Sequence, residues 1–371
     1  MSIMYKAFIY RLYPTAKQTS FFIKTFGCCR KVYNLMLADK IAYYEKTGSM
    51  LAVTPAKYKK DYPFLKEVDS LALANEQLHL QKAYKNFFRD PKIGFPKFKS
   101  DKRCRKSYTT NNQRGTIAIT NNSIRLPKIG YIKARIHRYP PTNWQIKSAT
   151  VFQETDGKFY VSILCKYQAV IPPAPVTKDA TLGLDYKSNG LYADSNGDIC
   201  GMPHYYKESA KRLAKAQRKL QHKCPGSRNY YKQQKKIAKI CRHVASQRMD
   251  FLHKKSAAIA KQYSYICVES LNMKSLANKS FHNGKATLNN GYGKFLFMLT
   301  YKLQDHGGEL IKVDKWFPSS QLCNRCGSLH PEMRNLSLRI LNCGCGYTCD
   351  RDYNAAKNIK KEGLRMFKLA S

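Results

Sequence analysis

The excess of positive charge constrains this chain more than any other feature of its sequence. Its 371 residues include 66 lysines and arginines but only 24 aspartates and glutamates, which gives a formal net charge of +42. Such a charge repels itself in a compact fold, so we expect a polyanion beside it, and nucleic acid is the obvious one. A highly soluble surface and a membrane-surface binder are the alternatives. They are less favoured because 26 tyrosines and 17 phenylalanines run among the basic residues, a mixture that suits base stacking and phosphate binding.

The N-terminus and the cysteines bear on where the protein works. Lys6 and Arg11 stand where a signal peptide would be apolar, and no stretch approaches the roughly 18 apolar residues of a membrane-spanning helix. We therefore expect a cytoplasmic protein without a membrane partner. Four of the 13 cysteines cluster at metal-ligand spacing, which favours a reducing compartment over a disulfide framework. Seven others are scattered singly: Cys104, Cys165, Cys200, Cys224, Cys241, Cys267 and Cys349.

The first half of the chain predicts strands that are interrupted by helices. Residues 5–14 alternate in polarity as a strand does, and a helix should then run to Gly48. A second helix opens at Ser70, and between 115 and about 170 the apolar period turns to two. This order predicts a small β-barrel with a helical insertion after its first strand. The apolar stripe of the first helix is Phe22, Phe26, Cys29, Val32 and Tyr33.

The second half predicts an α/β fold. Residues 171–180 contain three prolines and read as a rigid linker. The elements beyond it follow the order β, β, β, α, β, α, β, α, which is that of the ribonuclease H-like fold. Residues 205–262 are predicted as long basic helices, for which both a solvated charged face and a wall that binds nucleic acid remain open.

Four cysteines near the C-terminus predict a zinc site. Cys323 and Cys326 form a C-x2-C pair, and Cys343 and Cys345 form a C-x-C pair. Four thiolates from two tight turns suit tetrahedral Zn²⁺, and they leave no open ligand position, so the metal should be structural. Buried reduced cysteines are the alternative. Cys349 is expected to be a packing residue and not a ligand.

Two acids stand at the ends of apolar strands. Asp185 ends "TLGLD" and Glu269 ends "YICVE", in a chain that has few acids. Active sites of open α/β sheets lie at the carboxyl ends of their strands, which favours a catalytic role. Each acid alone could equally be a solvated strand end or a helix cap.

A third acid comes from the start of the last helix, where Asp350 and Asp352 compete. Asp352 shares a helical stripe with Ala355, Ala356 and Ile359, which we expect to face the sheet. Asp350 lies off this stripe and suits the helix cap. Asp185, Glu269 and Asp352 together could hold two Mg²⁺ ions about 4 Å apart and so hydrolyse a phosphodiester.

These motifs resemble the TnpB family of transposon-encoded RNA-guided DNA endonucleases, which are related to type V CRISPR effectors. The resemblance runs in family order along nearly the whole chain. It rests on "YRLYPT" (10–15), "FGCCRKVYN" (26–34), "AYKNFF" (83–88), "FPKFKS" (95–100), "RLPKIG" (125–130), "GLDY" (183–186), "VESL" (268–271), "WFPSSQLCNRCG" (316–327) and "CGYTCDRDYNAAKNI" (345–359).

The resemblance implies a domain plan and a set of site residues. A ribonuclease H-like RuvC nuclease domain (173–318 and 350–371) would be interrupted by a zinc-ribbon insert that binds the target nucleic acid (319–349). An N-terminal wedge β-barrel (1–13 and 106–172) would carry a helical recognition lobe (14–105). Asp185, Glu269 and Asp352 match the catalytic triad. Cys323, Cys326, Cys343 and Cys345 match the zinc ligands, although the C-x-C pair departs from the commoner C-x2-C.

The resemblance also implies partners. These are a guide RNA derived from the transposon end and double-stranded target DNA, with one protein per RNA, in the nucleoid of a bacterium or archaeon. Residues 70–110 would recognise a short DNA motif that flanks the target, and the basic helices would face the guide RNA or the RNA–DNA duplex. The expected contacts are Gln77, Gln81, Lys82, Lys85, Tyr108, Thr109, Arg212, Arg218, Arg248 and Arg351. A nuclease-inactive RNA-guided repressor and an autonomous DNA transposase are the competing hypotheses, and the intact acid triad disfavours the repressor.

Overall fold

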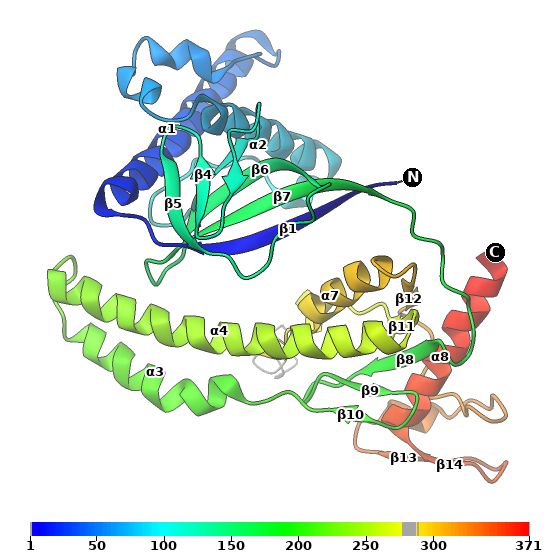
Figure 1. Ribbon diagram of the computed structural model, residues 1–371. Coiled ribbons are helices and arrows are strands. Elements are labelled where there is room, and N and C mark those ends of the chain that lie inside the picture. The colour runs from blue at the N-terminus through cyan, green and yellow to red at the C-terminus, as the bar shows by residue number, and fades with distance from the viewer. Residues whose placement is uncertain (1, 277–286, 288, 371) are drawn as a thin grey trace. The chain divides into compact units, whose positions relative to one another are not determined.

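The computed structural model describes residues 2–276, 287 and 289–370. The chain divides into two compact units, Met1–Val170 and Ile171–Ser371, and each has its own hydrophobic core (Figure 1). No helix in the described part of the chain is long and apolar enough to cross a membrane.

The first unit is built on one seven-stranded antiparallel sheet. Its strands lie in the order β2-β6-β7-β1-β5-β4-β3. β1 pairs with β7 along its whole length, and its last two residues, Arg11 and Leu12, also pair with β5. Strands from both ends of the sheet contribute to one core, so the sheet curls around it. The sequence predicts a barrel; in the structure β2 and β3 are the two edges of this sheet. The strands are β1 Ser2–Leu12, β2 Lys106–Asn111, β3 Ala118–Ile119, β4 Ser123–Leu126, β5 Gly130–Arg135, β6 Gln145–Gln153 and β7 Phe159–Ala169.

Two helices are inserted between β1 and β2, as the sequence predicts. Helix α1 (Ala16–Thr47) starts at a capping box between Thr15 and Gln18 and ends at Gly48, whose φ of 67° is left-handed. The five residues of its predicted stripe are all buried. Helix α2 (Ser70–Arg89) is capped by Asp69, which also accepts a hydrogen bond from Thr110 of β2. Short 3₁₀ helices span Pro55–Lys59, Pro63–Lys66 and Pro91–Ile93.

The second unit contains a five-stranded mixed sheet in the order β10-β9-β8-β11-β12. β8 (Thr181–Tyr186), β11 (Tyr265–Glu269) and β12 (Glu309–Val313) are parallel, whereas β9 (Tyr192–Asp194) and β10 (Ile199–Cys200) add an antiparallel edge. β9 and β10 form a hairpin that turns through residues 195–198.

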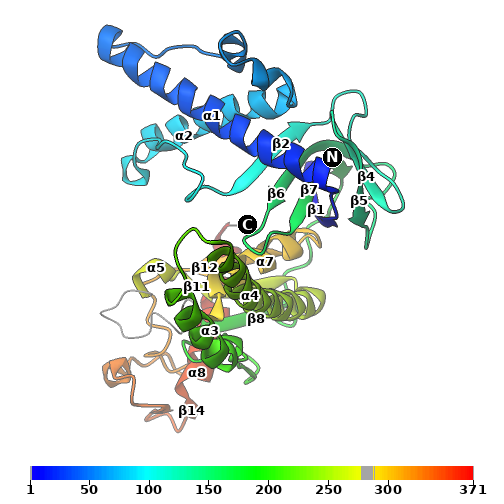
Figure 2. The ribbon, with the colours of Figure 1, turned by 90° about the vertical axis from the view of Figure 1, so that its left-hand side faces the viewer.

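Helices cover both faces of this sheet (Figures 1 and 2). Helix α4 (Arg228–Gln262) and helix α7 (Tyr292–Gln304) share a core with Leu182, Leu184, Ile266 and Val268 on one face. The alternate residues Tyr265 and Cys267 turn to the other face, where helix α8 (Arg351–Ala370) packs. The remaining elements are α3 (Tyr205–Gln221), α5 (Met273–Leu276), a 3₁₀ turn (Pro331–Arg334), β13 (Ile340–Asn342) and β14 (Thr348–Asp350).

Two glycines let α8 lie unusually close to the sheet. A Cβ on Gly183 of β8 would stand 2.2 Å from the Ala356 carbonyl oxygen of α8. A Cβ on Gly363 of α8 would stand 2.3 Å from the Cys267 sulfur of β11. Both sites lack room for a methyl group, so the glycines fix the depth at which α8 sits.

Replacement of Gly183 by alanine should therefore push α8 off the sheet. We expect a loss of about 1–3 kcal/mol in the free energy of unfolding, the range for an overpacked core. Denaturant unfolding of the purified chain would measure it. Gly201→Ala is the matched control, because a Cβ there has nothing within 4 Å; an equal loss in both variants would contradict the close-approach explanation.

Candidate functional site

Two of the three predicted carboxylates lie side by side at one edge of the sheet. Val268 of β11 is opposite Leu184 of β8 in parallel register, and the next residues along these strands are Glu269 and Asp185. The two acids therefore extend from neighbouring strands in the same direction. Glu269 is in turn opposite Val313, the last residue of β12.

The last helix brings the third carboxylate to this edge. Asp350 lies directly before α8, and its Oδ1 accepts hydrogen bonds from the N–H groups of Asp352 (2.9 Å) and Tyr353 (3.1 Å). The prediction that Asp350 caps this helix is therefore confirmed. Ala355, Ala356 and Ile359 are buried, as the stripe predicts.

Burial and the proximity of the acids change their protonation. Burial, together with the charges of Glu269 and Asp352, raises the pKa of Asp185 to about 8, while Arg351 and Lys187 oppose the shift. Burial also raises the pKa of Glu269. A site where carboxylates resist ionisation in this way is one that a bound cation would stabilise.

Asp352 is held by two basic side chains. Its Oδ2 lies 2.6 Å from Lys187 Nζ and 2.9 Å from Arg339 Nη2. Among the described residues, the three carboxylates are not as tightly gathered as the cysteines, which alone form a set of three or more metal-binding side chains with all ligand atoms within 4.8 Å. The ligand atoms of the three acids are therefore more widely spaced than those of the four thiols.

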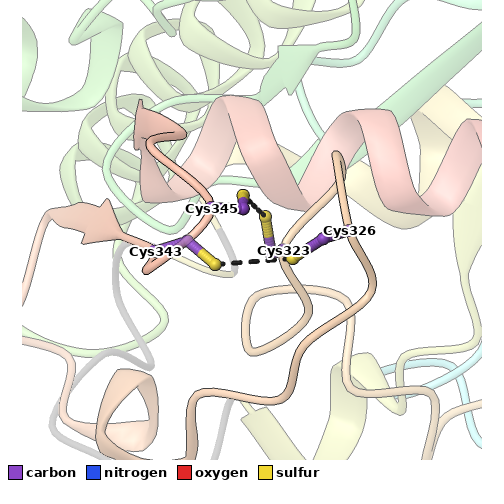
Figure 3. Close-up of side chains that lie close together, drawn as sticks. All are labelled: Cys323, Cys326, Cys343 and Cys345. Carbon is purple, nitrogen blue, oxygen red and sulfur yellow. Dashed lines mark hydrogen bonds between the residues drawn. The ribbon is translucent and has the colours of Figure 1, made fainter.

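The four predicted cysteines converge on one point (Figure 3). The Sγ atoms of Cys323 and Cys345 are 3.7 Å apart, and those of Cys326 and Cys343 are 3.5 Å apart. Tetrahedral zinc with Zn–S bonds of about 2.3 Å requires sulfurs about 3.8 Å apart, so the geometry fits.

The surroundings of the thiols also favour a metal. The hydroxyl and the backbone N–H of Ser328 lower the pKa of Cys326 to about 6, which favours the thiolate. Gly327 and Gly346 have φ of 80° and 77°, and each closes a tight turn after a cysteine pair. Cys349 lies outside the set.

The cysteine-bearing segment is fastened to α8 by two asparagines. Asn354 donates to the Leu322 carbonyl (2.7 Å) and accepts from the backbone N–H of Asn324 (3.1 Å). Asn358 donates to the carbonyls of Ser319 (2.8 Å) and Leu322 (2.7 Å). The helix that carries Asp352 and the segment that carries Cys323 and Cys326 are thus one hydrogen-bonded unit.

The residues predicted to contact nucleic acid fall into three groups. Gln81, Lys82, Lys85, Arg212 and Arg218 are exposed. Gln77, Thr109 and Arg248 are half-buried; Thr109 bonds Thr150 (2.8 Å), and Arg248 bonds Asn289 (2.7 Å). Tyr108 and Arg351 are buried.

Burial contradicts two of these predicted contacts. Tyr108 is 2% exposed and packs against the rings of Phe22 and Phe26, so no base can reach it. Arg351 is 8% exposed and donates to the Asn335 carbonyl (3.1 Å), where it supports the start of α8 instead of reaching outward.

The sequence did not reveal the partners of Asp352. Lys187 follows Asp185 by two residues, and this spacing could have predicted that Lys187 lies near the acids. Arg339 is 13 positions from Asp352, and only the register of β13 with β14 brings it back, because Ile340 pairs with Asp350 and the Arg351 N–H donates to the Arg339 carbonyl (2.7 Å).

Comparison with known proteins identifies the family. The chain is 35% identical over 369 residues to a protein from Streptomyces pristinaespiralis that is named as an RNA-guided DNA endonuclease. The match covers 97% of this chain and 89% of that protein. It is 30% identical over 382 residues to a protein from Escherichia coli K12 named RNA-guided DNA endonuclease InsQ, covering 96% and 92%. The chain belongs to the TnpB family of RNA-guided DNA endonucleases.

Matches to parts of the chain agree with this family. Residues 292–359 match the Cas12f1-like TNB domain and residues 162–280 match a probable transposase family. Residues 1–49 match a helix-turn-helix domain, although the structure has strand β1 and the single helix α1 in the described part of that range. A solved structure of a Cas12f1–sgRNA–target DNA complex has a similar fold, with a TM-score of 0.61 at 14% identity, covering 93% of this chain and 83% of that chain.

The thiol site predicts a specific metal dependence. Cys326→Ser should lower the zinc content of the purified chain from one equivalent towards zero and loosen the insert, which weakens DNA cleavage while RNA binding persists. Elemental analysis and cleavage assays measure both. Cys349→Ser should keep its zinc; a variant at Cys326 with full zinc and full cleavage would contradict the assignment.

Proposed function

We propose that this protein is a transposon-encoded, RNA-guided endonuclease that hydrolyses phosphodiester bonds of double-stranded DNA beside a short flanking motif. The observation that carries the proposal is the meeting of Asp185, Glu269 and Asp352 at one sheet edge, in a chain of net charge +42. Three acids gathered at one edge of so basic a chain indicate a functional site, and metal-dependent phosphodiester hydrolysis is the chemistry that such acids support.

The acids suit divalent cations. Asp185, Glu269 and Asp352 would hold two Mg²⁺ ions, which bind carboxylate oxygens and supply Lewis-acid activation of water and of the leaving oxygen. The fit is supported by the raised pKa of Asp185, because burial and the charges of Glu269 and Asp352 disfavour its ionised form and a bound cation would favour it. Lys187 and Arg339 now contact Asp352 Oδ2, and both side chains would have to move away for that oxygen to bind a metal. The four cysteines would hold one structural Zn²⁺.

The domain plan follows the same proposal. Residues 173–318 and 350–371 would be a ribonuclease H-like RuvC nuclease domain, and 319–349 its zinc-ribbon insert. Residues 1–13 and 106–172 would be the wedge barrel, with 14–105 as the recognition lobe. The strand order β10-β9-β8-β11-β12, with three parallel strands, supports the ribonuclease H-like assignment.

The exposed face of α2 would meet the flanking duplex. Gln81, Lys82 and Lys85 are exposed along this helix, and amide side chains can pair with adenine in the major groove. Thr109 is half-buried beside α2 and remains a proposed contact. We further propose one protein per guide RNA and a cytoplasmic, nucleoid-associated location.

The α3–α4 hairpin would bind the guide RNA. Residues 205–262 contain 17 lysines and arginines but only two acids, Glu208 and Asp250. Near the closed end of the hairpin lies a cavity of about 480 Å³ between α3 and α4, large enough for a nucleotide. Neither acid lines it. The lining residues are Lys219, His222, Lys223, Asn229, Lys232, Gln233 and Lys236.

The decisive experiment removes one carboxylate. Asp185→Ala should abolish cleavage of a matched plasmid in Mg²⁺, because the metals lose a shared ligand, while guide RNA and DNA binding stay nearly intact. Retained cutting would refute the mechanism. A wild-type complex that binds matched DNA and never cuts it would favour the repressor, and a preparation without a co-purifying RNA of defined length would favour a transposase.

Charge reversal tests the hairpin. In Lys223→Glu/Lys232→Glu, the slope of log affinity for guide RNA against log salt should shrink by about 0.7–0.9 for each lost phosphate contact. Filter binding across a salt series measures the slope. Lys361→Glu, an exposed lysine of α8 outside the cavity, is the control; equal slopes in all three proteins would exclude the hairpin from the RNA interface.

A further inference from the structure

An exposed tryptophan stands beside the carboxylate edge and has no role in the proposed mechanism. Trp316 is 79% exposed, the highest value among the large hydrophobic side chains that the structure describes. It follows the end of β12 by three residues, and that end, Val313, is paired with Glu269. Since β8, β11 and β12 are parallel, Trp316 leaves the sheet at the same edge as Asp185 and Glu269.

The backbone around Trp316 is fixed, although its ring is not packed. The Trp316 N–H donates to Asp314 Oδ1 (2.7 Å), and the Phe317 N–H donates to the Asp314 carbonyl (3.2 Å). Phe317 turns inward to the core beneath α8. Two residues further on, the Ser319 carbonyl accepts from Asn358 of α8. The ring is therefore presented outward from a rigid turn that is tied both to β12 and to the helix of Asp352.

The chemistry around the ring selects a nucleobase. Lys315 Nζ lies 4.6 Å from the centroid of the Trp316 ring, so a cation is available for the phosphate next to any base stacked there. Aromatic rings beside lysine or arginine are the recurring platform for single-stranded nucleic acid. An aliphatic protein partner would contact the ring without using the charge of Lys315, and an acidic one would pair with Lys315 without stacking on the ring.

We propose that Trp316 is a base-stacking platform that positions the single strand of DNA entering the carboxylate site. This inference rests on the proposed endonuclease function. Pairing of the guide RNA with one strand of the target displaces the other strand, whose bases are then free to stack beside the cut. Trp316 holds one base, Lys315 faces the adjoining phosphate, and the scissile bond is thereby set relative to the acids.

The composition offers a direct test. The chain has only two tryptophans, and the other, Trp144, stacks on Tyr167 in the first unit with ring centroids 3.8 Å apart. Trp144→Phe keeps a ring there and leaves Trp316 as the sole indole. In the guide RNA complex of Trp144→Phe/Asp185→Ala, titration with a matched double-stranded DNA, which supplies the displaced strand, should quench the emission of Trp316 in a saturable manner.

Variants separate stacking from structure. Trp316→Ala should weaken DNA binding by about five- to a hundred-fold, as loss of a stacking partner does, without changing the melting temperature. Trp316→Phe should restore most of the affinity. Phe297→Ala, which removes a ring that is 70% exposed on α7, should change neither.

The outcomes are separable from those for the nuclease itself. If the fluorescence of Trp316 does not change when DNA is added, or if the guide RNA alone already quenches it fully, the stacking proposal is overturned even if the complex cuts DNA. Saturable quenching by DNA, lost affinity in Trp316→Ala and recovery in Trp316→Phe support stacking even if the wild-type complex proves unable to cut.

Discussion

The close packing of α8 on the sheet is the contact on which the rest of the second unit depends. Gly183 and Gly363 leave no room for a methyl group, so the helix backbone rests almost on β8 and the Cys267 sulfur rests on the helix. This depth sets where the first turn of α8 begins, and with it Asp352. A glycine inside a helix costs about 1 kcal/mol of helix propensity, which this packing has to offset.

The same helix joins the cysteine cluster to the carboxylate edge. Asn354 and Asn358 hold the segment that leads into the cysteine cluster, while Asp352, on the preceding turn, faces the acid edge. Arg339, which lies between the two cysteine pairs in the sequence, contacts Asp352 directly. The cysteine-bearing segment is therefore in contact with the acid site, although its free thiols lie close to one another and not to the acids.

The sequence alone was enough for the elements whose signals are local. The strand-end acids, the cysteine pairs, the α1 stripe and the choice of Asp350 as cap all follow from spacing along one strand or helix. What failed depended on tertiary contacts. Tyr108 was placed on a surface because it lies in a basic stretch, but the rings of α1 cover it. Arg351 lies beside an exposed cap yet points inward, because the end of the 3₁₀ turn Pro331–Arg334 offers it the Asn335 carbonyl. The partners of Asp352 depend on hairpin register, which spacing does not encode.

The α3–α4 hairpin combines a high positive charge with few buried residues. Helix α4 has 35 residues, about 52 Å at 1.5 Å per residue, and most of its buried residues lie in the half that packs on the sheet. In the outer half the buried residues of α4 are Gln233 and Val244, and the Gln233 side chain donates to the Ala216 carbonyl of α3. With 17 lysines and arginines against two acids in residues 205–262, this arm repels itself, and a guide RNA bound along it would offset that repulsion.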